Sequence, residues 1–279
     1  MGGDFNPLPT FLSAVPPASA TTIGDMSEFL TTAVEAALMA GKLLRENFEQ
    51  PLEVDEMQDH DIKLELDRRT QELIENHILA RHPDHAILGE EGIRGGTSDY
   101  EWIIDPLDGT VNYFYGIPHF ATTIAIRRNN TLLAGVIHDP LRHETWTVDT
   151  GGPALLNGRE IQVSKRTKLQ DCIVSMGVSK TIDTIDSTLP VFNQAIRRVK
   201  KMRMLGSAAL DIAYVASGRL DAYIEGTISL WDIAAGVLLV PAAGGVVDLQ
   251  PHPDNPNKFR IAATSGTVDF VSLLSNSPS

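Results

Sequence analysis

Cysteine is almost absent from this chain, which has one such residue among 279. A single cysteine excludes a framework of intrachain disulfides and is typical of proteins in a reducing compartment, so we expect a cytoplasmic location. Cys172 lies in the apolar run Cys-Ile-Val-Ser-Met, which predicts a small buried side chain without a chemical role. The sequence also lacks an uninterrupted apolar stretch long enough to cross a bilayer, and we therefore expect no association with a membrane.

Positive charge is scarce as well. The 23 lysine and arginine residues stand against 36 aspartate and glutamate residues, which gives a formal net charge of −13. Such a surface repels a phosphate polymer, so we expect no binding of nucleic acid. An acidic protein can still hold a small phosphorylated molecule if bound cations reverse the sign of the local potential. A dense basic run occurs at residues 197–203, on a predicted helix, and such runs usually form a solvated face.

Periodic apolar patterns are missing from residues 1–24, which contain four prolines and are expected to form a mobile tail. The start Met-Gly-Gly-Asp has no positive charge, so a secretion signal is not predicted. The rest of the chain alternates helical and antiparallel-strand patterns, which indicates an α+β fold. We expect two halves, an N-terminal one at residues 25–150 with the metal site and a C-terminal one at residues 151–279 that completes the substrate site.

Residues 102–110 (Trp-Ile-Ile-Asp-Pro-Leu-Asp-Gly-Thr) carry the strongest chemical signal. The apolar residues predict a short buried strand that Pro106 ends, because proline cannot donate to a β-ladder. Asp105 and Asp108 follow, and two carboxylates that close repel each other unless cations lie between them. Hard cations such as Mg²⁺ prefer oxygen ligands of this kind. On its own, Asp-Pro-Leu-Asp-Gly is also an ordinary surface turn, so the prediction of a metal needs support from elsewhere.

Two other predicted element ends carry acids. Residues 85–89 predict a short strand that is followed by the carboxylate pair Glu90 and Glu91. Asp232 stands at the start of an apolar helix that is predicted to begin at Trp231. Three separate element ends that each present an acid indicate one convergent cluster.

The motifs Gly-Glu-Glu at residues 89–91, Asp-Pro-Leu-Asp-Gly-Thr at 105–110 and Trp-Asp-Ile-Ala-Ala-Gly at 231–236 occur in this order along the chain. Together they resemble the inositol monophosphatase family of Mg²⁺-dependent, lithium-sensitive phosphatases. The resemblance covers residues 26–270. It implies a five-layer αβαβα sandwich with the site between its halves, a small phosphorylated substrate and assembly as a homodimer.

The resemblance also implies roles for individual residues. The metal ligands would be Glu90, Asp105 and the Leu107 carbonyl for a first Mg²⁺ ion, and Asp105, Asp108 and Asp232 for a second. The catalytic residues that orient the attacking water would be Asp67, Glu90 and Thr110. The substrate contacts would be Asp108, Gly109, Thr110, Ser207, Ala208, Glu225 and Asp232. Two such ions would activate the water and stabilise the leaving oxygen.

Residues 61–67 (Asp-Ile-Lys-Leu-Glu-Leu-Asp) alternate in polarity, which predicts a strand. Asp67 is expected to begin a helix that ends before Pro83, and on the residues alone it is an N-cap. The resemblance adds a contact between Asp67 and Thr110. The sequence departs from the family pattern here, because Leu64 stands where a threonine is usual and no lysine matches the usual one upstream.

Three further patterns complete the predicted elements. Asp25 to Glu28 has the form of a capping box before a long amphipathic helix. Gly206 to Ala209 opens a helix that runs to about Gly218, and its small residues expose backbone N–H groups that suit phosphate. Tight helix packing is the alternative explanation of these small residues. The family resemblance favours a role in phosphate binding. Residues 220–225 predict a strand that ends at Glu225.

Several alternatives stay open at the level of sequence. Inositol 1-phosphate is the favoured substrate, but histidinol phosphate or a sugar phosphate requires the same chemistry. A non-catalytic binding protein of the same fold would be expected to lose a metal ligand, whereas all the acidic ligands are present. A transition-metal site at His119, His138 and His143 is not indicated, because no helical His-x-x-x-His pair or cysteine accompanies them.

Overall fold

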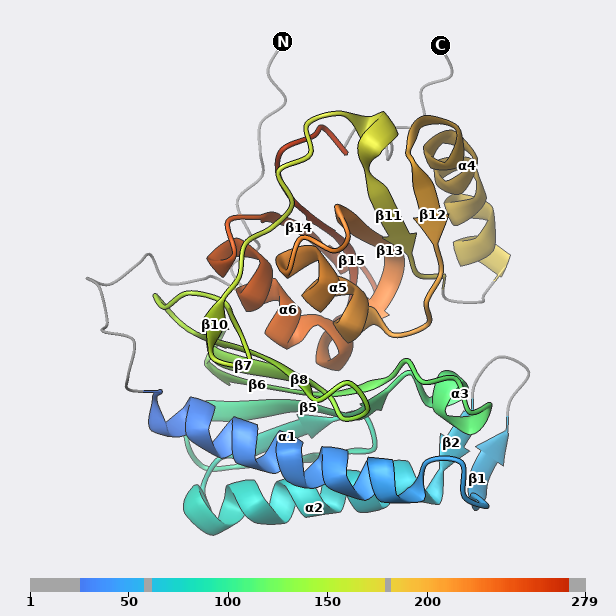
Figure 1. Cartoon of the computed structure of the whole chain (residues 1–279). Helices are drawn as coiled ribbons and strands as arrows, with labels where there is room; N and C mark the ends of the chain where they lie inside the picture. Colours follow the sequence, from blue (N-terminus) through green and yellow to red (C-terminus); the bar gives the residue numbers. More distant parts are fainter. Residues whose placement is uncertain (1–25, 58–61, 179–181, 271–279) are drawn as a thin grey trace.

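The structure is a computed structural model that describes residues 26–57, 62–178 and 182–270. The predicted tail, residues 1–24, lies outside these ranges, and so does Asp25 of the predicted capping box. Within the described part of the chain, two β-sheets and the helices around them stack in five layers (Figure 1).

The helices occupy three of these layers. Helices α1 (Glu28–Asn47) and α2 (Glu65–Arg81) cover one face of the larger sheet, and α5 (Ala208–Ala216) and α6 (Leu230–Ala242) lie between the two sheets (Figure 1). Helix α4 (Ile182–Arg198) covers the outer side of the smaller sheet. The predicted α+β fold and its αβαβα layering are therefore confirmed. Among the helices of the described ranges, none combines the length and the apolar character that a membrane span requires.

The larger sheet has eight strands within the described residues, in the spatial order β10-β9-β8-β7-β6-β5-β3-β4. Strands β3 and β5 are parallel, so their C-terminal ends reach the same edge of the sheet, while the other neighbouring pairs are antiparallel. The strands are β3 (Ala86–Gly89), β4 (Gly92–Arg94), β5 (Tyr100–Asp108), β6 (Ala121–Arg128), β7 (Thr131–Asp139), β8 (Glu144–Asp149), β9 (Leu155–Leu156) and β10 (Arg159–Glu160).

The smaller sheet has five strands in the same described ranges, in the order β12-β11-β13-β15-β14. Strand β11 is parallel to its neighbours β12 and β13, and β15 is antiparallel to its neighbours β13 and β14. These strands are β11 (Ile173–Met176), β12 (Lys201–Arg203), β13 (Ala222–Ser229), β14 (Val246–His252) and β15 (Asn255–Thr264). The remaining elements are the paired strands β1 (Val54–Met57) and β2 (Ile62–Leu64), the short helix α3 (Thr110–Phe114) and a 3₁₀ turn at Leu169–Asp171.

The middle layer joins the two sheets into one core. Helices α5 and α6 are apolar on nearly all sides and contact strands of both sheets, as expected for helices that lie between two layers. A single cluster of buried apolar side chains runs from Ile103 of the larger sheet through these helices to Ile261 of the smaller sheet. The division of the chain at residue 150 stays a prediction, since the larger sheet continues to Glu160.

Helix α1 begins with a cap that differs from the predicted one. The Ser27 hydroxyl oxygen accepts a hydrogen bond from the Leu30 N–H (3.1 Å), and Ser27 donates to Asp149 through its own N–H (2.9 Å) and hydroxyl (2.6 Å). The cap therefore lies two residues after the predicted one and ties the helix to β8. The predicted amphipathic helix is confirmed, because one side of it is buried, for example at Leu30, Gly41 and Leu44.

Helix α2 begins at Glu65, two residues before the predicted start at Asp67. The Oδ2 atom of Asp67 accepts a hydrogen bond from the N–H of Leu64, the residue that precedes the helix (2.9 Å). The prediction that Asp67 is the N-cap is therefore wrong. Its carboxylate still satisfies a backbone donor and places negative charge in the first turn, where the helix dipole favours it. The end of the helix at Arg81, before Pro83, is as predicted.

Strand β5 passes through Pro106, contrary to the prediction that this residue ends it. The register with β6 shifts between Asp105 and Asp108, which marks a β-bulge. Proline is tolerated at a bulge because the ladder of backbone hydrogen bonds is interrupted there. The Pro106 carbonyl instead accepts a hydrogen bond from the Thr122 hydroxyl (2.9 Å). The spacing of Asp105 and Asp108 is thus set by a bulge within β5 and not by the end of the strand at Pro106.

Boundaries in the C-terminal half differ from the predictions by a few residues. The strand predicted at residues 220–225 is β13, which starts at Ala222 and continues beyond Glu225 to Ser229. Helix α6 begins at Leu230 rather than Trp231, so the strand leads directly into the helix. Cys172 is buried as predicted, and burial raises the pKa of its thiol to about 11, which keeps the thiol protonated at neutral pH.

His138 of β7 is buried against α1. A Cβ atom on Gly41 would overlap its ring, and its Nδ1 forms a hydrogen bond with the Thr145 hydroxyl (2.9 Å). Burial lowers the pKa of His138 to about 4, and the charges of His143 and Arg45 act in the same direction. The unfolded chain thus binds a proton here below about pH 6.5, whereas the folded chain does so only near pH 4. This residue therefore favours folding above pH 6.5, and that contribution is lost as the pH falls.

We predict that His138→Gln removes this pH dependence. Between pH 7 and pH 5, the free energy of unfolding of the wild-type protein should fall by about 2 kcal/mol more than that of the variant. Urea denaturation of both proteins at the two pH values measures the difference. An equal loss in the two proteins would contradict the role given to His138.

Candidate functional site

Asp105 and Asp108 lie at the C-terminal end of β5, on either side of the bulge. The Oδ1 atom of Asp105 accepts a hydrogen bond from the Leu107 N–H (2.9 Å). The turn continues through Gly109, whose φ of 98° lies in the left-handed region that favours glycine. A Cβ atom on Gly109 would lie 3.1 Å from the carbonyl oxygen of His119. The chain therefore needs glycine here both for its conformation and for the close approach of another backbone segment.

Asp232 reaches the same place from the C-terminal half of the chain. It is the third residue of α6, and its Oδ2 atom accepts a hydrogen bond from the N–H of Ser229, the last residue of β13 (3.1 Å). The direct connection between strand and helix thus fixes its orientation. Asp105, Asp108 and Asp232 each offer a carboxylate oxygen within 4.8 Å of those of the other two. We call these three residues the carboxylate cluster.

The carboxylate cluster is electrostatically strained. Burial raises the pKa of Asp105 well above its usual range, and the negative charges of Glu90 and Asp232 raise it further. Burial likewise raises the pKa of Asp108 to about 6, and burial together with the charge of Glu90 raises that of Asp232 well above its usual range. Bringing these acids together costs free energy unless the cluster takes up protons or cations. Because all the donors are carboxylate oxygens, the cluster suits a hard divalent cation such as Mg²⁺.

Glu90 lies beside the carboxylate cluster, just after β3. Its N–H donates to the Ile104 carbonyl (3.2 Å), which extends the parallel pairing of β3 with β5. Its negative charge raises the pKa of both Asp105 and Asp232, so its carboxylate lies near theirs. The group of oxygens within 4.8 Å does not include Glu90. The structure therefore brings Glu90 to the site, and its role as a metal ligand stays a prediction.

The start of α5 contacts Asp108. The Ser207 hydroxyl donates to Oδ2 of Asp108 (2.5 Å), and the N–H groups of Ala208 and Ala209 donate to its two carboxylate oxygens (3.2 and 2.8 Å). These hydrogen bonds partly offset the effect of burial on the pKa of Asp108. The sequence analysis assigned Ser207 and Ala208 to phosphate. In the structure they position Asp108, and a contact with phosphate stays a prediction.

Thr110 begins α3, and Asp67 lies near the same helix. Thr110 is the first residue of α3, and its hydroxyl donates to the Leu107 carbonyl (3.0 Å). The pKa of Tyr113 in the same helix is raised by burial and by the negative charge of Asp67, so Asp67 lies near α3. Leu64 packs in an apolar cluster and is 1 % exposed. The contact between Asp67 and Thr110 stays a prediction.

Glu225 lies in β13, close to the carboxylate cluster. Its Oε2 atom accepts a hydrogen bond from the hydroxyl of Tyr223, two residues earlier on the same face of the strand. Burial raises the pKa of Glu225 to about 7, and the charges of Asp108 and Asp211 raise it while Lys258 lowers it. A fourth acid thus faces the site from the smaller sheet.

The histidines that a transition metal would require do not converge. His138 forms its hydrogen bond with Thr145, His143 lies beside Arg45 (3.3 Å), and His119 faces Asp211 (3.8 Å). In the part of the chain that the structure describes, the carboxylate cluster is the one group of acidic, histidine or cysteine side chains close enough together to hold a metal ion.

Comparison with known protein families matches residues 25–274 to the inositol monophosphatase family. The chain belongs to this family. It is 41% identical over 259 residues to the Nus factor SuhB of Pseudomonas aeruginosa, with 89% of this chain and 95% of that protein covered. It is 39% identical over 253 residues to the inositol-1-monophosphatase of Mesorhizobium japonicum, with 88% and 95% covered.

A solved structure shows the same fold. The extragenic suppressor protein suhB from Bartonella henselae superposes with a TM-score of 0.82 at 32% sequence identity, over 89% of this chain and 97% of that one. Members of the inositol monophosphatase family use divalent metals and act on small phosphorylated substrates. The carboxylate cluster supplies a place in this member where such a metal fits.

Asn112 is a site residue that the sequence analysis missed. Its side-chain amide donates to the carbonyls of His119 and Leu205, each at 2.8 Å. A Cβ atom on Gly206 would lie 2.9 Å from the Nδ2 atom of Asn112. Asn112 therefore connects the turn after β5 with the loop before α5 and joins the two halves of the site. Its position two residues after Thr110 is the only signal in the sequence, and nothing there shows that it reaches residue 205.

Asp211 of α5 is a second residue that the sequence analysis missed. It is 2 % exposed and accepts a hydrogen bond from the Ser175 hydroxyl (2.6 Å). Burial raises the pKa of Asp211, and its charge in turn raises the pKa of Asp108. His119 lies opposite Asp211 from the N-terminal half of the chain. A contact between a histidine and an acid thus joins the two halves near Asp108.

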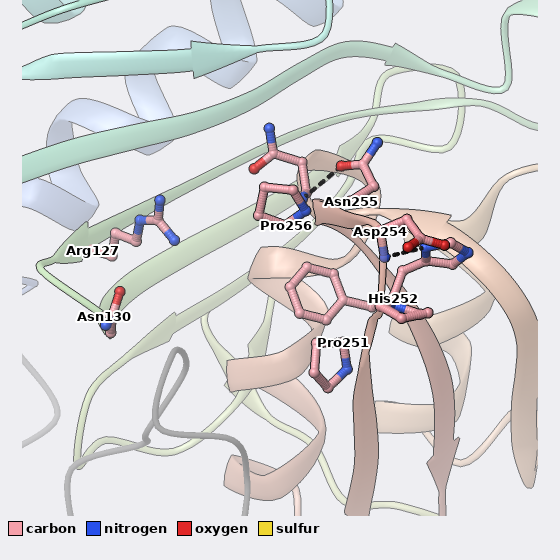
Figure 2. A pocket seen from close by; sticks show the side chains of 10 residues that line it. Arg127, Asn130, Pro251, His252, Asp254, Asn255 and Pro256 are labelled. Atoms are coloured by element: carbon pink, nitrogen blue, oxygen red, sulfur yellow. Dashed lines mark hydrogen bonds between the residues drawn. The ribbon is translucent and has the colours of Figure 1, made fainter.

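A cavity of about 550 Å³ lies between the β6–β7 turn and the β14–β15 hairpin (Figure 2). Arg127 and Asn130 lie on one side of it, and Pro251 and Pro256 belong to the hairpin on the other side. The described residues that line it include none of the predicted site residues. Arg127 forms an ion pair with Glu101, which offsets its positive charge. We assign no chemistry to this cavity.

In the absence of divalent cations, we predict that Asp105→Asn stabilises the protein. The substitution removes one of three mutually repelling carboxylates, and an asparagine Oδ1 can still accept the hydrogen bond from Leu107. The free energy of unfolding in EDTA should rise by about 0.5 to 2 kcal/mol. Excess Mg²⁺ should stabilise the wild-type protein and stabilise the variant much less. Thermal and urea denaturation with and without Mg²⁺ measure both effects.

Asp139→Asn is the matched control. Asp139 is also a buried acid of the larger sheet, but it is paired with Arg142 (2.7 Å) and accepts two backbone hydrogen bonds. Its replacement should therefore destabilise the protein and leave the stabilisation by Mg²⁺ intact. A lower stability of Asp105→Asn in EDTA would contradict the view that the carboxylate cluster is strained.

Proposed function

We propose that this protein is a Mg²⁺-dependent phosphomonoesterase that hydrolyses a small polyol phosphate, with inositol 1-phosphate as its preferred substrate. The observation that carries this proposal is the carboxylate cluster, in which acids from β5 and α6 present oxygens within 4.8 Å of one another. Membership of the inositol monophosphatase family supports the reaction class. With a single buried cysteine, a cytoplasmic location is part of the proposal.

The metal site in this proposal consists of oxygen ligands alone. Glu90, Asp105 and the Leu107 carbonyl would hold one cation, and Asp105, Asp108 and Asp232 would hold a second. When bound, divalent cations at such a site supply Lewis-acid stabilisation of the charges that develop on the phosphate ester and on the water that attacks it. The raised pKa values of the cluster support this proposal, because a cation removes the repulsion that causes them.

The remaining site residues orient water and substrate. Glu90 and Thr110 would align the attacking water, and Asp67 would support Thr110 from the start of α2. Gly109, Ser207 and Ala208 would donate hydrogen bonds to phosphate oxygens, which requires the start of α5 to share its donors between Asp108 and the phosphate. Asp108, Glu225 and Asp232 would accept hydrogen bonds from hydroxyl groups of the substrate. Preorganised donors and acceptors of this kind lower the barrier because they need no reorientation during the reaction.

Other substrates and roles define the alternatives. Histidinol phosphate and sugar phosphates remain candidates with the same mechanism. Some relatives are named inositol-1-monophosphatase and others Nus factor SuhB, so a role as a binding protein of the same fold is a separate candidate. The complete carboxylate cluster favours an enzyme, because a protein that only binds partners has no need to keep strained acids together.

We predict Mg²⁺-dependent release of phosphate from inositol 1-phosphate, with inhibition by lithium. Asp105→Asn should lower kcat by about a hundredfold or more, because the substitution removes a shared anionic ligand. Steady-state kinetics on inositol 1-phosphate, histidinol phosphate and fructose 1,6-bisphosphate, each under magnesium titration, identify the substrate by its kcat/KM.

Asp139→Asn is again the control. Asp139 lies outside the site, so this variant should retain the wild-type kcat. Unchanged turnover in Asp105→Asn would remove the ligand role of that residue. Absence of phosphatase activity in the wild-type protein, together with no Mg²⁺ binding by calorimetry, would favour the binding protein.

We also propose that two copies of the chain associate through α4. Leu189, Ile196 and Met204 are 56%, 50% and 60% exposed, and with the half-buried Phe192 they form an apolar surface that we call the α4 face. In Figure 1, α4 lies at the outer edge of the molecule. An antiparallel arrangement of two such helices places Asp186, near the start of α4, beside the partner's Arg197 near its end, so the charges as well as the apolar side chains are complementary.

We predict that Ile196→Glu converts a dimer into a monomer, because it places a charge within the apolar interface. Analytical ultracentrifugation of the wild-type protein and the variant at micromolar concentration measures the change. Leu38→Glu is the control, since Leu38 is similarly exposed (46%) but lies on α1. A wild-type monomer, or a variant that stays dimeric, would contradict the proposed interface.

A further inference from the structure

Tyr223 is a buried tyrosine whose hydroxyl meets a site residue. Its side chain is 1 % exposed, and its hydroxyl donates a hydrogen bond to Oε2 of Glu225. The two residues are on the same face of β13, because side chains two apart on a strand point the same way. Hydrogen bonds from a neutral donor to a carboxylate are among the stronger ones in proteins. Tyr223 thus fixes one of the two oxygens of Glu225.

Gly177 provides the space for this pair. It follows β11 directly, and its N–H donates to the carbonyl of Ile224, between the two residues of the pair (3.0 Å). A Cβ atom at this position would lie 2.7 Å from the Tyr223 hydroxyl and would overlap Oε2 of Glu225. The φ of Gly177 is not in the left-handed region, so its backbone conformation does not require glycine. The absence of a side chain is needed because the carboxylate and the hydroxyl occupy that volume.

The geometry leaves Glu225 with one orientation. Tyr223 holds Oε2 from the interior, and the backbone of Gly177 closes the space beside it. In the described part of the chain, the hydrogen bond of Glu225 involves Oε2 alone. Oε1 is thus the oxygen that can accept a hydrogen bond from a ligand. Glu225 lies near Asp108, since the charge of Asp108 acts on it, so that ligand would reach across from the carboxylate cluster.

We propose that Tyr223 is a positioning residue that acts through Glu225 to select substrates with a hydroxyl group close to the phosphate. This inference rests on the proposed phosphatase function and on the proposed contact between Glu225 and substrate. Tyr223 does not touch the substrate. It holds the carboxylate of Glu225 in the orientation that accepts the hydroxyl, so that this part of the site is formed before the substrate binds. Preorganisation of this kind raises affinity because less freedom is lost on binding.

The test uses two substrates that differ in the feature that is recognised. Inositol 1-phosphate has hydroxyl groups next to the phosphate, whereas 4-nitrophenyl phosphate has none. Tyr223→Phe removes only the hydroxyl oxygen. In this variant, KM for inositol 1-phosphate should rise about tenfold, the factor expected for a lost hydrogen bond to a charged group. For 4-nitrophenyl phosphate, kcat and KM should stay within about twofold of the wild-type values.

Tyr113→Phe is the matched control. Tyr113 is also a buried tyrosine whose hydroxyl makes one hydrogen bond, to the Leu44 carbonyl (2.7 Å), away from Glu225. Its replacement should lower the melting temperature and leave the ratio of kcat/KM for the two substrates unchanged. Gly177→Ala is a second test that keeps the Tyr223 hydroxyl but displaces Glu225, and it should change that ratio in the same direction as Tyr223→Phe.

The outcomes separate this inference from the proposed function. If the wild-type protein hydrolyses both substrates and Tyr223→Phe keeps its KM for inositol 1-phosphate, the role of Tyr223 is overturned and the proposed function stands. If Tyr223→Phe loses activity equally on both substrates, its role is only structural, and the inference is also overturned. A wild-type protein that hydrolyses neither substrate overturns the proposed function and this inference with it.

Discussion

Repulsion among buried carboxylates is the constraint on which the rest of the structure depends. Asp105 and Asp108 come from β5, and Asp232 comes from α6 at the opposite end of the sequence. Holding them within reach of one another requires that both sheets share one core, which α5 and α6 provide. Both helices also begin at the site, so their positive ends face the acids. The apolar middle layer thus supports a cluster that would otherwise separate.

The protein partly compensates this repulsion with its own hydrogen bonds. Ser207 and the first N–H groups of α5 donate to Asp108, and Tyr223 donates to Glu225. Asn112 holds the two turns together so that these donors stay in place. None of these groups carries a positive charge, so the compensation is incomplete and the pKa of Asp108 stays raised. The remaining imbalance is what a divalent cation would remove, and it links the fold to the proposed chemistry.

The sequence was sufficient for the α+β class and for the positions of the acids, because both follow from local patterns, whereas the five layers were implied by the family resemblance. Apolar periodicity locates helices and strands, and Asp105, Asp108 and Asp232 stand at recognisable element ends. What it could not provide depends on contacts between distant segments. Strand β5 continues through Pro106 because a bulge opposite β6 accommodates it, and Ser27 caps α1 with the help of Asp149 on β8.

The central claim is that the carboxylate cluster holds protons when no cation is bound and releases them when one binds. Calorimetric titration of the metal-free protein with Mg²⁺ near pH 6, repeated in buffers of different ionisation enthalpy, measures that proton release directly. Burial raises the pKa of Asp108 to about 6, and a bound cation should lower it, so Mg²⁺ should bind with release of protons. Binding without proton release, or no binding at all, would contradict the account.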